Sequence, residues 1–217
     1  MMDTTTSQNS DTSSDTDVTI KKHFTHTKWI VWYHNPSDKN WTVDSYKDII
    51  EISSIEDFCV LKNTWDKCLP KTDEGMFFLM RKIGDTCIYP QWEDKHNTNG
   101  GYWSFKVAKA DSENAWFELM TYMLGECITK LPENTMEING ISISPKKNFC
   151  ILKIWNKDSQ KSSNSILSND LKFLDMNEVI YSSHNNNIQR DQTKLKKYEN
   201  HRKKRRNRNN NRLFDRM

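Results

Sequence analysis

Short stretches rich in apolar and aromatic residues, separated by turn residues, constrain the fold of this chain more than any other feature. About eight of them are typical of strands, at 27–33, 46–52, 76–81, 86–89, 102–107, 137–143, 149–155 and 178–183. A period of two places successive side chains on opposite faces of a sheet. Close spacings, such as that around Lys82-Ile83-Gly84-Asp85, indicate hairpins. The pattern therefore predicts an antiparallel sheet.

Two segments between the predicted strands follow the helical period instead. Ser54 begins the first, with Asp57 as its capping partner, and Asp111 or Ser112 begins the second. A weaker third helix is expected over about 163–174. The core-facing residues of the first two helices are predicted to be Phe58, Leu61, Trp65, Trp116, Leu119, Met120, Met123, Leu124 and Cys127. These elements predict an α+β fold with helices on one face of the sheet.

Length and composition fit one domain. The chain has 217 residues, of which 35% are hydrophobic, and we expect its core within residues 23–185. Residues 1–22 are rich in Ser, Thr and Asp without apolar periodicity, so we expect them to be disordered. No window has the apolar length of a membrane span. We therefore expect a soluble, monomeric, intracellular protein that does not contact a membrane.

The five cysteines, at positions 59, 68, 87, 127 and 150, form no C-x-x-C pair and have no clustered histidines. An odd number without such spacing argues against a disulfide framework or a zinc site. We expect reduced thiols that pack as small hydrophobic side chains, and no metal or cofactor.

Charge is distributed unevenly along the chain. Residues 190–217 hold twelve Lys and Arg against three Asp and Glu, which leaves 20 against 26 in the other 189 residues. An acidic body followed by a basic tail, residues 186–217, is thus predicted, and so dense a charge favours disorder in the tail. The tail is open to three interpretations: a solvated extension, a nonspecific contact with RNA phosphates, or a nuclear-import signal.

Two tryptophans stand in polar surroundings, where a buried indole would be unusual. Trp41 follows a polar loop at 35–40, and Trp92 comes just after Pro90 and directly before Glu93. A pair of indoles can stack on a flat cationic ring, which an aromatic face attracts. A carboxylate beside them can accept two parallel N–H bonds from a guanine edge. N7-methylguanine, the head of a capped messenger RNA, combines the positive ring with that edge.

Several short segments extend this observation between His26 and Trp155, in a characteristic order and spacing. They are Trp29-Ile-Val-Trp32, Lys39-Asn-Trp41, Ser54-Ile-Glu-Asp-Phe58, Trp92-Glu-Asp94, Gly100-Gly-Tyr-Trp103, Trp116-Phe-Glu118, Gly125-Glu126 and Ile154-Trp155. In these segments the chain resembles the translation initiation factor 4E family, which binds the messenger RNA cap. The resemblance implies a curved antiparallel sheet of about eight strands, with three helices on its convex face and a cap slot on its concave side.

Carried over residue by residue, the resemblance implies that Trp41 and Trp92 stack on the methylated base. It implies Glu93 as the acceptor for the guanine edge, with the backbone N–H of Trp92 on the guanine carbonyl, and Trp155 as the wall against the N7-methyl group. Trp155 ends an apolar strand, so a purely structural role is its alternative. The remaining large indoles are expected in the core: Trp29, Trp32, Trp65, Trp103 and Trp116.

The cap's phosphates require cations, and here the chain departs from the family. Lys146 stands where the family has a phosphate-binding arginine, but Ile151 stands in place of a phosphate-binding lysine. Lys153 shares a strand face with Ile151 and can substitute for it, and Lys147 is a further candidate. Tyr102 replaces another family arginine. One or two basic contacts are therefore absent or relocated, and each lysine has simple solvation as its alternative.

The surface that binds a helical partner in the family is altered as well. His23, Ile55 and Glu118 match the family, but Cys59 replaces a partner-binding tryptophan and Phe117 replaces an aliphatic residue. Loss of an interface tryptophan typically costs about 2–4 kcal/mol of binding free energy. The protein partner, a scaffold or an inhibitor, has a shape that fits this altered surface, or else this protein recruits no partner.

Three functions are compatible with the sequence. The first is a cap-binding translation factor with a divergent partner, and the second is a cap-binding competitor that sequesters messages. The third, a cap-processing enzyme, is disfavoured because the six glycines form no nucleotide loop and no nucleophile constellation is evident. We expect a binding protein for capped messenger RNA in the cytoplasm, with nuclear import through the basic tail as an option.

Overall fold

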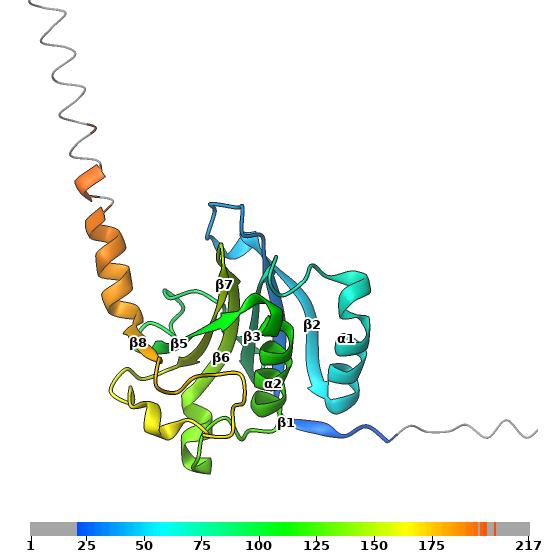
Figure 1. Cartoon of the computed structure of the whole chain (residues 1–217). Coiled ribbons are helices and arrows are strands. Elements are labelled where there is room, and N and C mark those ends of the chain that lie inside the picture. The colour runs from blue at the N-terminus through cyan, green and yellow to red at the C-terminus, as the bar shows by residue number, and fades with distance from the viewer. Residues whose placement is uncertain (1–20, 195, 199–201, 203–217) are drawn as a thin grey trace, which may run out of the picture.

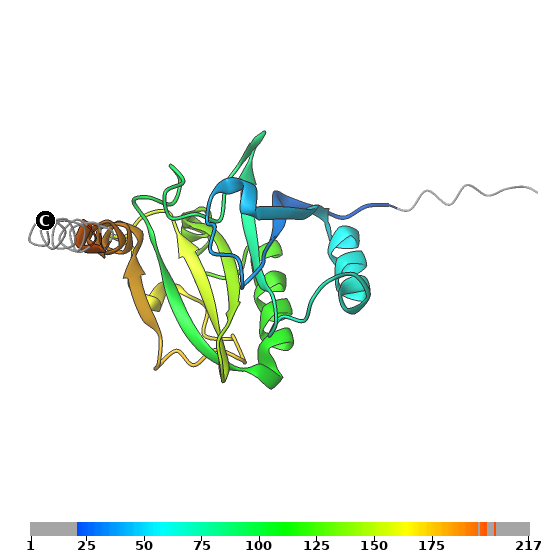
Figure 2. The same ribbon diagram turned by 90° about the horizontal axis from the view of Figure 1, so that it is seen from above.

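An eight-stranded antiparallel sheet forms the centre of the molecule. The computed structural model describes residues 21–194, 196–198 and 202. The strands are β1 (Phe24–His34), β2 (Tyr46–Ser54), β3 (Met76–Ile83), β4 (Thr86–Cys87), β5 (Gly101–Ala108), β6 (Ile138–Pro145), β7 (Phe149–Asn156) and β8 (Ile180–Ser183). They run in the order β2-β1-β3-β6-β7-β5-β8, with β4 paired to β3, and the sheet is curved (Figures 1 and 2). The antiparallel sheet predicted from the short strands and their hairpin-like spacings is confirmed.

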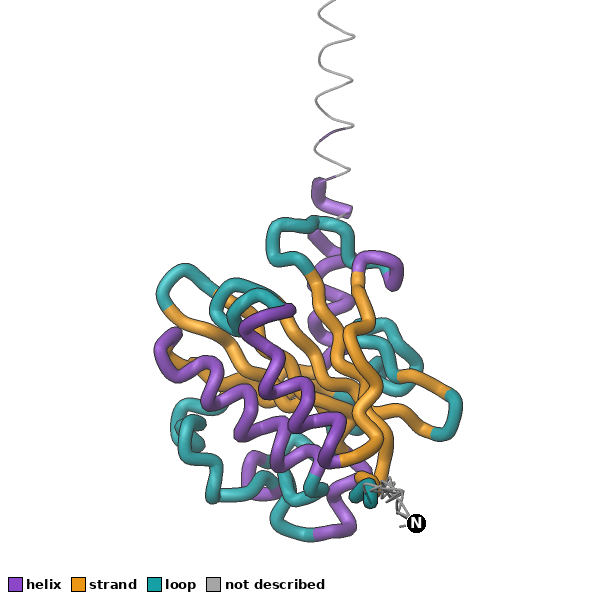
Figure 3. The backbone as a smooth tube through the Cα atoms, turned by 90° about the vertical axis from the view of Figure 1, so that its right-hand side faces the viewer, coloured by secondary structure: helices purple, strands orange, loops and turns teal. Residues whose placement is uncertain are grey.

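Two α-helices cover the same face of this sheet (Figure 3). Helix α1 (Ile55–Cys68) begins where predicted, because the Ser54 side chain accepts a hydrogen bond from the Asp57 N–H. Helix α2 (Ser112–Leu124) follows the short 3₁₀ turn η2 (Lys109–Asp111). The remaining short turns are η1 (Val43–Ser45), η3 (Pro132–Glu137) and η4 (Asn164–Ile166).

Strand alternation divides the apolar side chains into two clusters, one on each face. In β1, Trp29 and Val31 join the cluster under the helices, whereas Ile30 and Trp32 join the cluster on the opposite face. Helices α1 and α2 contribute Leu61, Trp65, Trp116, Leu119 and Met120, among others, to the first cluster. The five tryptophans expected in the core are all buried. The second cluster forms the floor of the site described below.

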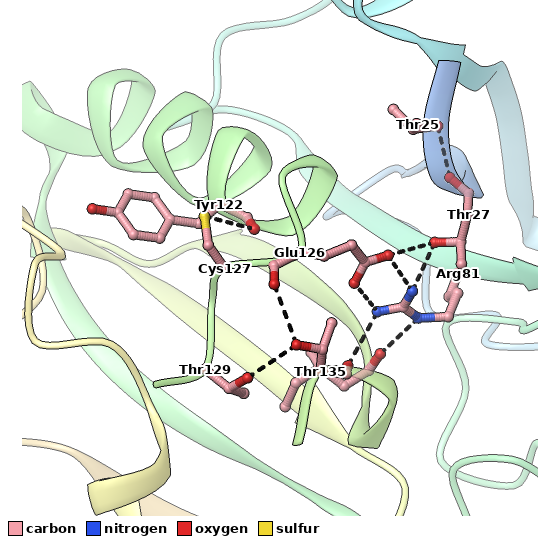
Figure 4. A network of polar contacts seen from close by, with 9 residues as sticks. Thr25, Thr27, Arg81, Tyr122, Glu126, Cys127, Thr129 and Thr135 are labelled. Atoms are coloured by element: carbon pink, nitrogen blue, oxygen red, sulfur yellow. Dashed lines mark hydrogen bonds and ion pairs between the residues drawn. The ribbon is translucent and has the colours of Figure 1, made fainter. Parts of the chain in front are cut away.

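A buried arginine in β3 links β1, the loop after α2 and the start of β6 (Figure 4). The Arg81 guanidinium donates to both carboxylate oxygens of Glu126, at 2.5 and 2.9 Å, and stacks on Trp29 at 4.2 Å. Its other N–H groups donate to the Thr27 hydroxyl and to backbone carbonyls of Thr135 and Ile138. All five donors of this guanidinium thus have acceptors, as a buried charge requires.

The third predicted helix is absent: residues 163–174 form only the single turn η4 and loops. Its leucine spacing is helix-like, but its backbone bonds to another segment instead. The Ser168 N–H donates to the Ile128 carbonyl, and the Lys130 N–H donates to the Ile166 carbonyl. The leucines are buried through these pairings, so tertiary contacts override the local period.

Two further expectations need correction. Residues 184–194 are helical, where we expected a disordered tail from residue 186, because His184 and Asn187 are buried against the domain. The cysteines carry free thiols, but Cys59, Cys68 and Cys127 are exposed and do not pack as core residues. The expectations for residues 1–20 and for most of the basic tail lie outside the described residues. No helix in the described part of the chain is long and apolar enough to span a membrane.

The Arg81–Glu126 pair predicts a large effect of a small change. Glu126→Gln keeps the side-chain shape but leaves the buried guanidinium without its countercharge, so unfolding should become easier by about 3 kcal/mol. Urea denaturation followed by tryptophan fluorescence measures this. The matched control is Glu51→Gln, because Glu51 pairs with Lys28 and Lys82 near the surface, and its loss should cost under about 1 kcal/mol. Equal effects of the two changes would contradict the structural role of the buried pair.

Candidate functional site

A pocket of about 280 Å³ opens on the sheet face opposite to α1 and α2. Aromatic side chains, two carboxylates and two lysines give it a mixed character. It is lined by Trp41, Tyr46, Met76, Phe78, Pro90, Gln91, Trp92, Glu93, Ser142, Ser144, Lys146, Lys153, Trp155 and Asp191. Residues from separate loops, strands and the C-terminal helix therefore meet here.

Trp41 is held in place from one side and open on the other. Its indole is 50% exposed and stacks on the buried His34 ring, with centroids 4.2 Å apart and planes 2° from parallel. The His34 ring is fixed in turn by a 2.8 Å hydrogen bond between Nε2 and the Asn40 carbonyl. One indole face is therefore covered by imidazole, and an exposed face remains for a ligand.

Trp92 lies on a loop that buried polar groups hold rigid. The Asn97 side-chain amide donates to the carbonyls of Tyr89 and Gln91 and accepts from the Asn139 amide. Gln91 also donates to the Trp41 carbonyl at 2.6 Å, which ties the two tryptophan loops together. These hydrogen bonds fix the two loops that carry Trp41 and Trp92 relative to each other.

Glu93 is exposed at the edge of the pocket. Its charge is close enough to the phenol of Tyr46 to matter: burial, and secondly the Glu93 carboxylate, raise the pKa of Tyr46 well above its ordinary value. An exposed carboxylate next to two indoles can accept hydrogen bonds from the edge of a stacked ring.

Trp155 is oriented by a hydrogen bond from its Nε1 to the Ser142 hydroxyl, 2.9 Å long. It is almost fully buried, yet it lines the pocket. His184 packs on it at 4.8 Å between ring centroids and also contacts Tyr102 at 5.5 Å. Burial, and secondly the charge of Lys153, lower the pKa of His184 to about 3, so its ring is neutral.

The three candidate lysines are placed differently. Lys146 and Lys153 line the pocket, whereas Lys147 is exposed outside its lining. The Lys153 ammonium lies over the Tyr102 ring at 4.0 Å and over the Trp92 ring at 5.9 Å. Burial, and secondly repulsion by Lys146, lower the pKa of Lys153 to about 8. Two neighbouring cations at a pocket mouth favour an anionic group.

The five residues expected on a partner surface lie on the helix side. Ile55 and Cys59 are exposed on α1, and His23 pairs with Glu56 at 2.7 Å. Phe117 is buried under α1 and Glu118 accepts hydrogen bonds from the backbone of residues 172 and 173. Phe117 and Glu118 therefore also serve the packing of this face.

Sequence reasoning missed His34, Asn97 and His184. No local pattern marks His34, because any residue at the end of a strand such as β1 can be buried in the same way. Asn97 lies in a run of polar loop residues, where one amide is not distinguishable from the others. The preference of Asn for bonding nearby carbonyls was the only available signal.

Chemically, the pocket suits a flat ring with a donor edge toward Glu93 and a linked anion toward Lys146 and Lys153. Among the described residues, no group of three or more His, Cys, Asp or Glu side chains could hold a metal ion.

Comparisons with known proteins point to one family. The profile of the family described as eukaryotic initiation factor 4E matches residues 25–200. The Candida albicans eukaryotic translation initiation factor 4E is 31% identical over 178 residues, which cover 75% of this chain and 80% of that protein. The Dictyostelium discoideum factor of the same name is 30% identical over 190 residues, covering 82% and 71%. For the Saccharomyces cerevisiae factor, 27% identity extends over 146 residues, which cover 64% of each protein.

Solved structures show the same fold. C. elegans eIF4E-3, in complex with the 4E-binding protein Mextli and a cap analog, superimposes with a TM-score of 0.65 at 22% identity. The match covers 77% of this chain and 96% of that one. Ascaris suum eIF4E-3 with the m2,2,7G cap gives a TM-score of 0.54 at 25% identity, covering 65% and 77%.

The lowered pKa of Lys153 gives a prediction that needs no ligand. Nuclear magnetic resonance of the lysine side chains should find Lys153 losing its proton near pH 8, below the ordinary lysine pKa. Lys146→Gln should raise this pKa because it removes the repelling charge, although burial, the larger cause, stays. Lys147→Gln is the control and should leave the Lys153 titration unchanged. Titration of Lys153 at the ordinary lysine pKa in the native protein would contradict the crowding of charge at the pocket.

Proposed function

Since this chain belongs to the eukaryotic initiation factor 4E family, we propose that it binds the 7-methylguanosine cap of messenger RNA in cap-dependent translation initiation. The family profile and the cap complexes of the structural relatives support cap binding. The observation that carries the proposal for this chain is the meeting of Trp41, Trp92 and Glu93 around one pocket. The proposed role is binding, not catalysis, and its place is the cytoplasm.

The methylated base stacks between Trp41 and Trp92 in this proposal. Methylation at N7 gives the ring a positive charge, and an indole face attracts such a ring by about 0.5–2 kcal/mol. The His34 ring stacks on one face of the Trp41 indole, which supports a fixed stacking surface on the other face. Trp155, oriented by Ser142, limits the pocket beside the N7-methyl group.

Glu93 accepts two N–H bonds from the guanine edge, and the Trp92 backbone N–H donates to the guanine carbonyl. The exposure of the Glu93 carboxylate at the pocket edge supports this role. The phosphates of the cap bind Lys146 and Lys153, which both line the pocket. Lys147 lies outside the lining and is proposed to contribute only long-range attraction.

Binding of methylated and unmethylated cap nucleotides tests the proposal. We expect Trp92→Ala to abolish retention on a methylated-cap resin, because one stacking face is lost. Glu93→Gln should weaken m7GTP binding by about 2 kcal/mol, since a charge-assisted pair of hydrogen bonds is lost. Fluorescence titration with m7GTP and GTP measures both effects.

Glu113→Gln is the matched control, because Glu113 is an exposed glutamate on α2. This substitution should leave the affinity for m7GTP unchanged. Unmethylated GTP should compete poorly, since its ring carries no positive charge. Equal competition by GTP and m7GTP would exclude the stacking mechanism.

The opposite face of the sheet supports a second proposal, a protein partner on helix α1. The C. elegans relative was solved with a 4E-binding protein. In this chain Phe24, Ile55 and Val60 are exposed apolar residues at or next to α1, and Cys59 offers a smaller contact than tryptophan. We therefore propose a scaffold or inhibitory protein with a complementary, larger apolar group at this position.

Copurification from cells tests this partner. Ile55→Glu should remove a protein that copurifies with the native chain, because it places a charge in the apolar contact. Lys67→Glu, also on α1 and exposed, is the control that should retain it. If the native chain binds the cap but recovers no partner, the protein is instead a competitor that sequesters messages.

A further inference from the structure

The helix that follows β8 forms one wall of a second, more open hollow. This C-terminal helix comprises residues 184–194, and residues 196–198 and 202 are helical as well (Figure 1). The hollow has a volume of about 1050 Å³ and lies between the helix and the edge strand β8. It is lined by Ser159, Tyr181, Ser182, Ser183, Asn186, Asn187, Gln189, Arg190, Thr193, Lys194 and Lys197; we call it the basic groove.

Hydrogen bonds and ring contacts fix the start of the C-terminal helix beside the first pocket. The His184 N–H donates to the Gly100 carbonyl at 3.0 Å, and the Asn187 amide donates to the Tyr102 hydroxyl at 3.3 Å. The His184 ring packs between Trp155 and Tyr102, and it lies 6.5 Å from Trp92. The basic groove is therefore tied to the aromatic residues of the first pocket.

Two stripes of this helix face the two hollows. His184, Asn187 and Asp191 recur at intervals of three and four residues on the domain side, and Asp191 lines the first pocket. Arg190 and Lys194 lie on the adjoining stripe. Together with Lys197 they line the basic groove, and no Asp or Glu is among its lining residues. The helix thus presents Asp191 to the first pocket and a row of cations to the basic groove.

These cations are arranged as a linear anion would require. Arg190 and Lys194 lie about one helical turn apart, and Lys197, in the helical segment 196–198, lines the same groove; all three are exposed. Around them stand neutral hydroxyl and amide side chains, which are typical partners of phosphate and sugar oxygens. Lys194 also pairs with Asp191 at 2.9 Å, so an anion that binds Lys194 competes with this carboxylate.

We propose that the basic groove binds the sugar–phosphate backbone of the RNA that follows the cap. This inference rests on the proposed function, because the helix borders both the cap pocket and the groove. An acidic protein segment would fit the charges equally well. Adjacency to the cap pocket favours RNA, because the same helix borders both hollows and a strand whose cap is bound already lies next to this helix.

The test compares the native full-length chain with the triple variant Arg190→Gln, Lys194→Gln, Lys197→Gln. Both are titrated with m7GTP, with a capped RNA decamer and with the same decamer uncapped, over a range of salt concentrations. Three lost contacts to a single strand should reduce the slope of log K against log salt by about 2 for both decamers. Binding of m7GTP should stay unchanged, because it does not reach the groove.

The charge-matched control is Lys62→Gln, Lys67→Gln, Lys71→Gln, on and just after α1, near the opposite edge of the sheet. It should leave the salt slope as in the native chain. Asp191→Asn provides a change in the other direction: it frees Lys194 from its ion pair and should strengthen binding of the uncapped decamer, which does not occupy the cap pocket that Asp191 also lines. A gain in affinity cannot result from misfolding.

An unchanged salt slope in the triple variant would contradict RNA binding by the basic groove. An equally large decrease of the slope in the α1 control would contradict it as well. Competition by polyglutamate as strong as that of RNA at equal charge would assign the groove to acidic proteins instead. Failure of the cap proposal is distinguishable from these results. In that case m7GTP does not bind the native chain, while the uncapped decamer still reports on the groove.

Discussion

Each strand of this protein must satisfy two surroundings at once, because neighbouring side chains point to opposite faces of the sheet. In β7, Leu152 and Ile154 pack under the helices while Lys153 and Trp155 line the pocket. A shift of one residue in the register would exchange the two sets and destroy both faces. The polar network of Arg81 helps fix this register, since it joins β1, β3 and the start of β6 to the loop after α2.

The residues at the pocket depend on loops whose positions are set by polar contacts with the sheet. Asn97 and His34 are buried and place the Trp92 and Trp41 loops, while Gln91 joins the loops to each other. Loops that are ordered before binding lose less conformational entropy when a ligand enters. The rigid sheet and its buried amides therefore contribute to affinity without contacting the ligand.

The sequence predicted the sheet, the first two helices and the core tryptophans well, because each depends on a local period. It also predicted which tryptophans stand in polar loops, and Trp41 and Trp92 do line one pocket. It failed at 163–174, where backbone bonds to residues 128–130 replace a helix. It failed again at 184–194, since a helix there depends on burial of His184 and Asn187 against distant residues. Such long-range contacts leave no mark in a local pattern.

The electrostatics of the pocket indicate that its parts act together. The charge of Lys153 is costly at this position, because burial and the neighbouring charge of Lys146 both disfavour its protonated form. An anion between the two lysines relieves that cost, and Lys153 at the same time lies over the Trp92 ring. A cationic ring stacked on Trp92 would by itself add to the repulsion, whereas a ring that carries its own phosphates brings the compensating charge. The arrangement therefore favours a ligand in which the positive ring and the anion are covalently joined over one that offers either alone.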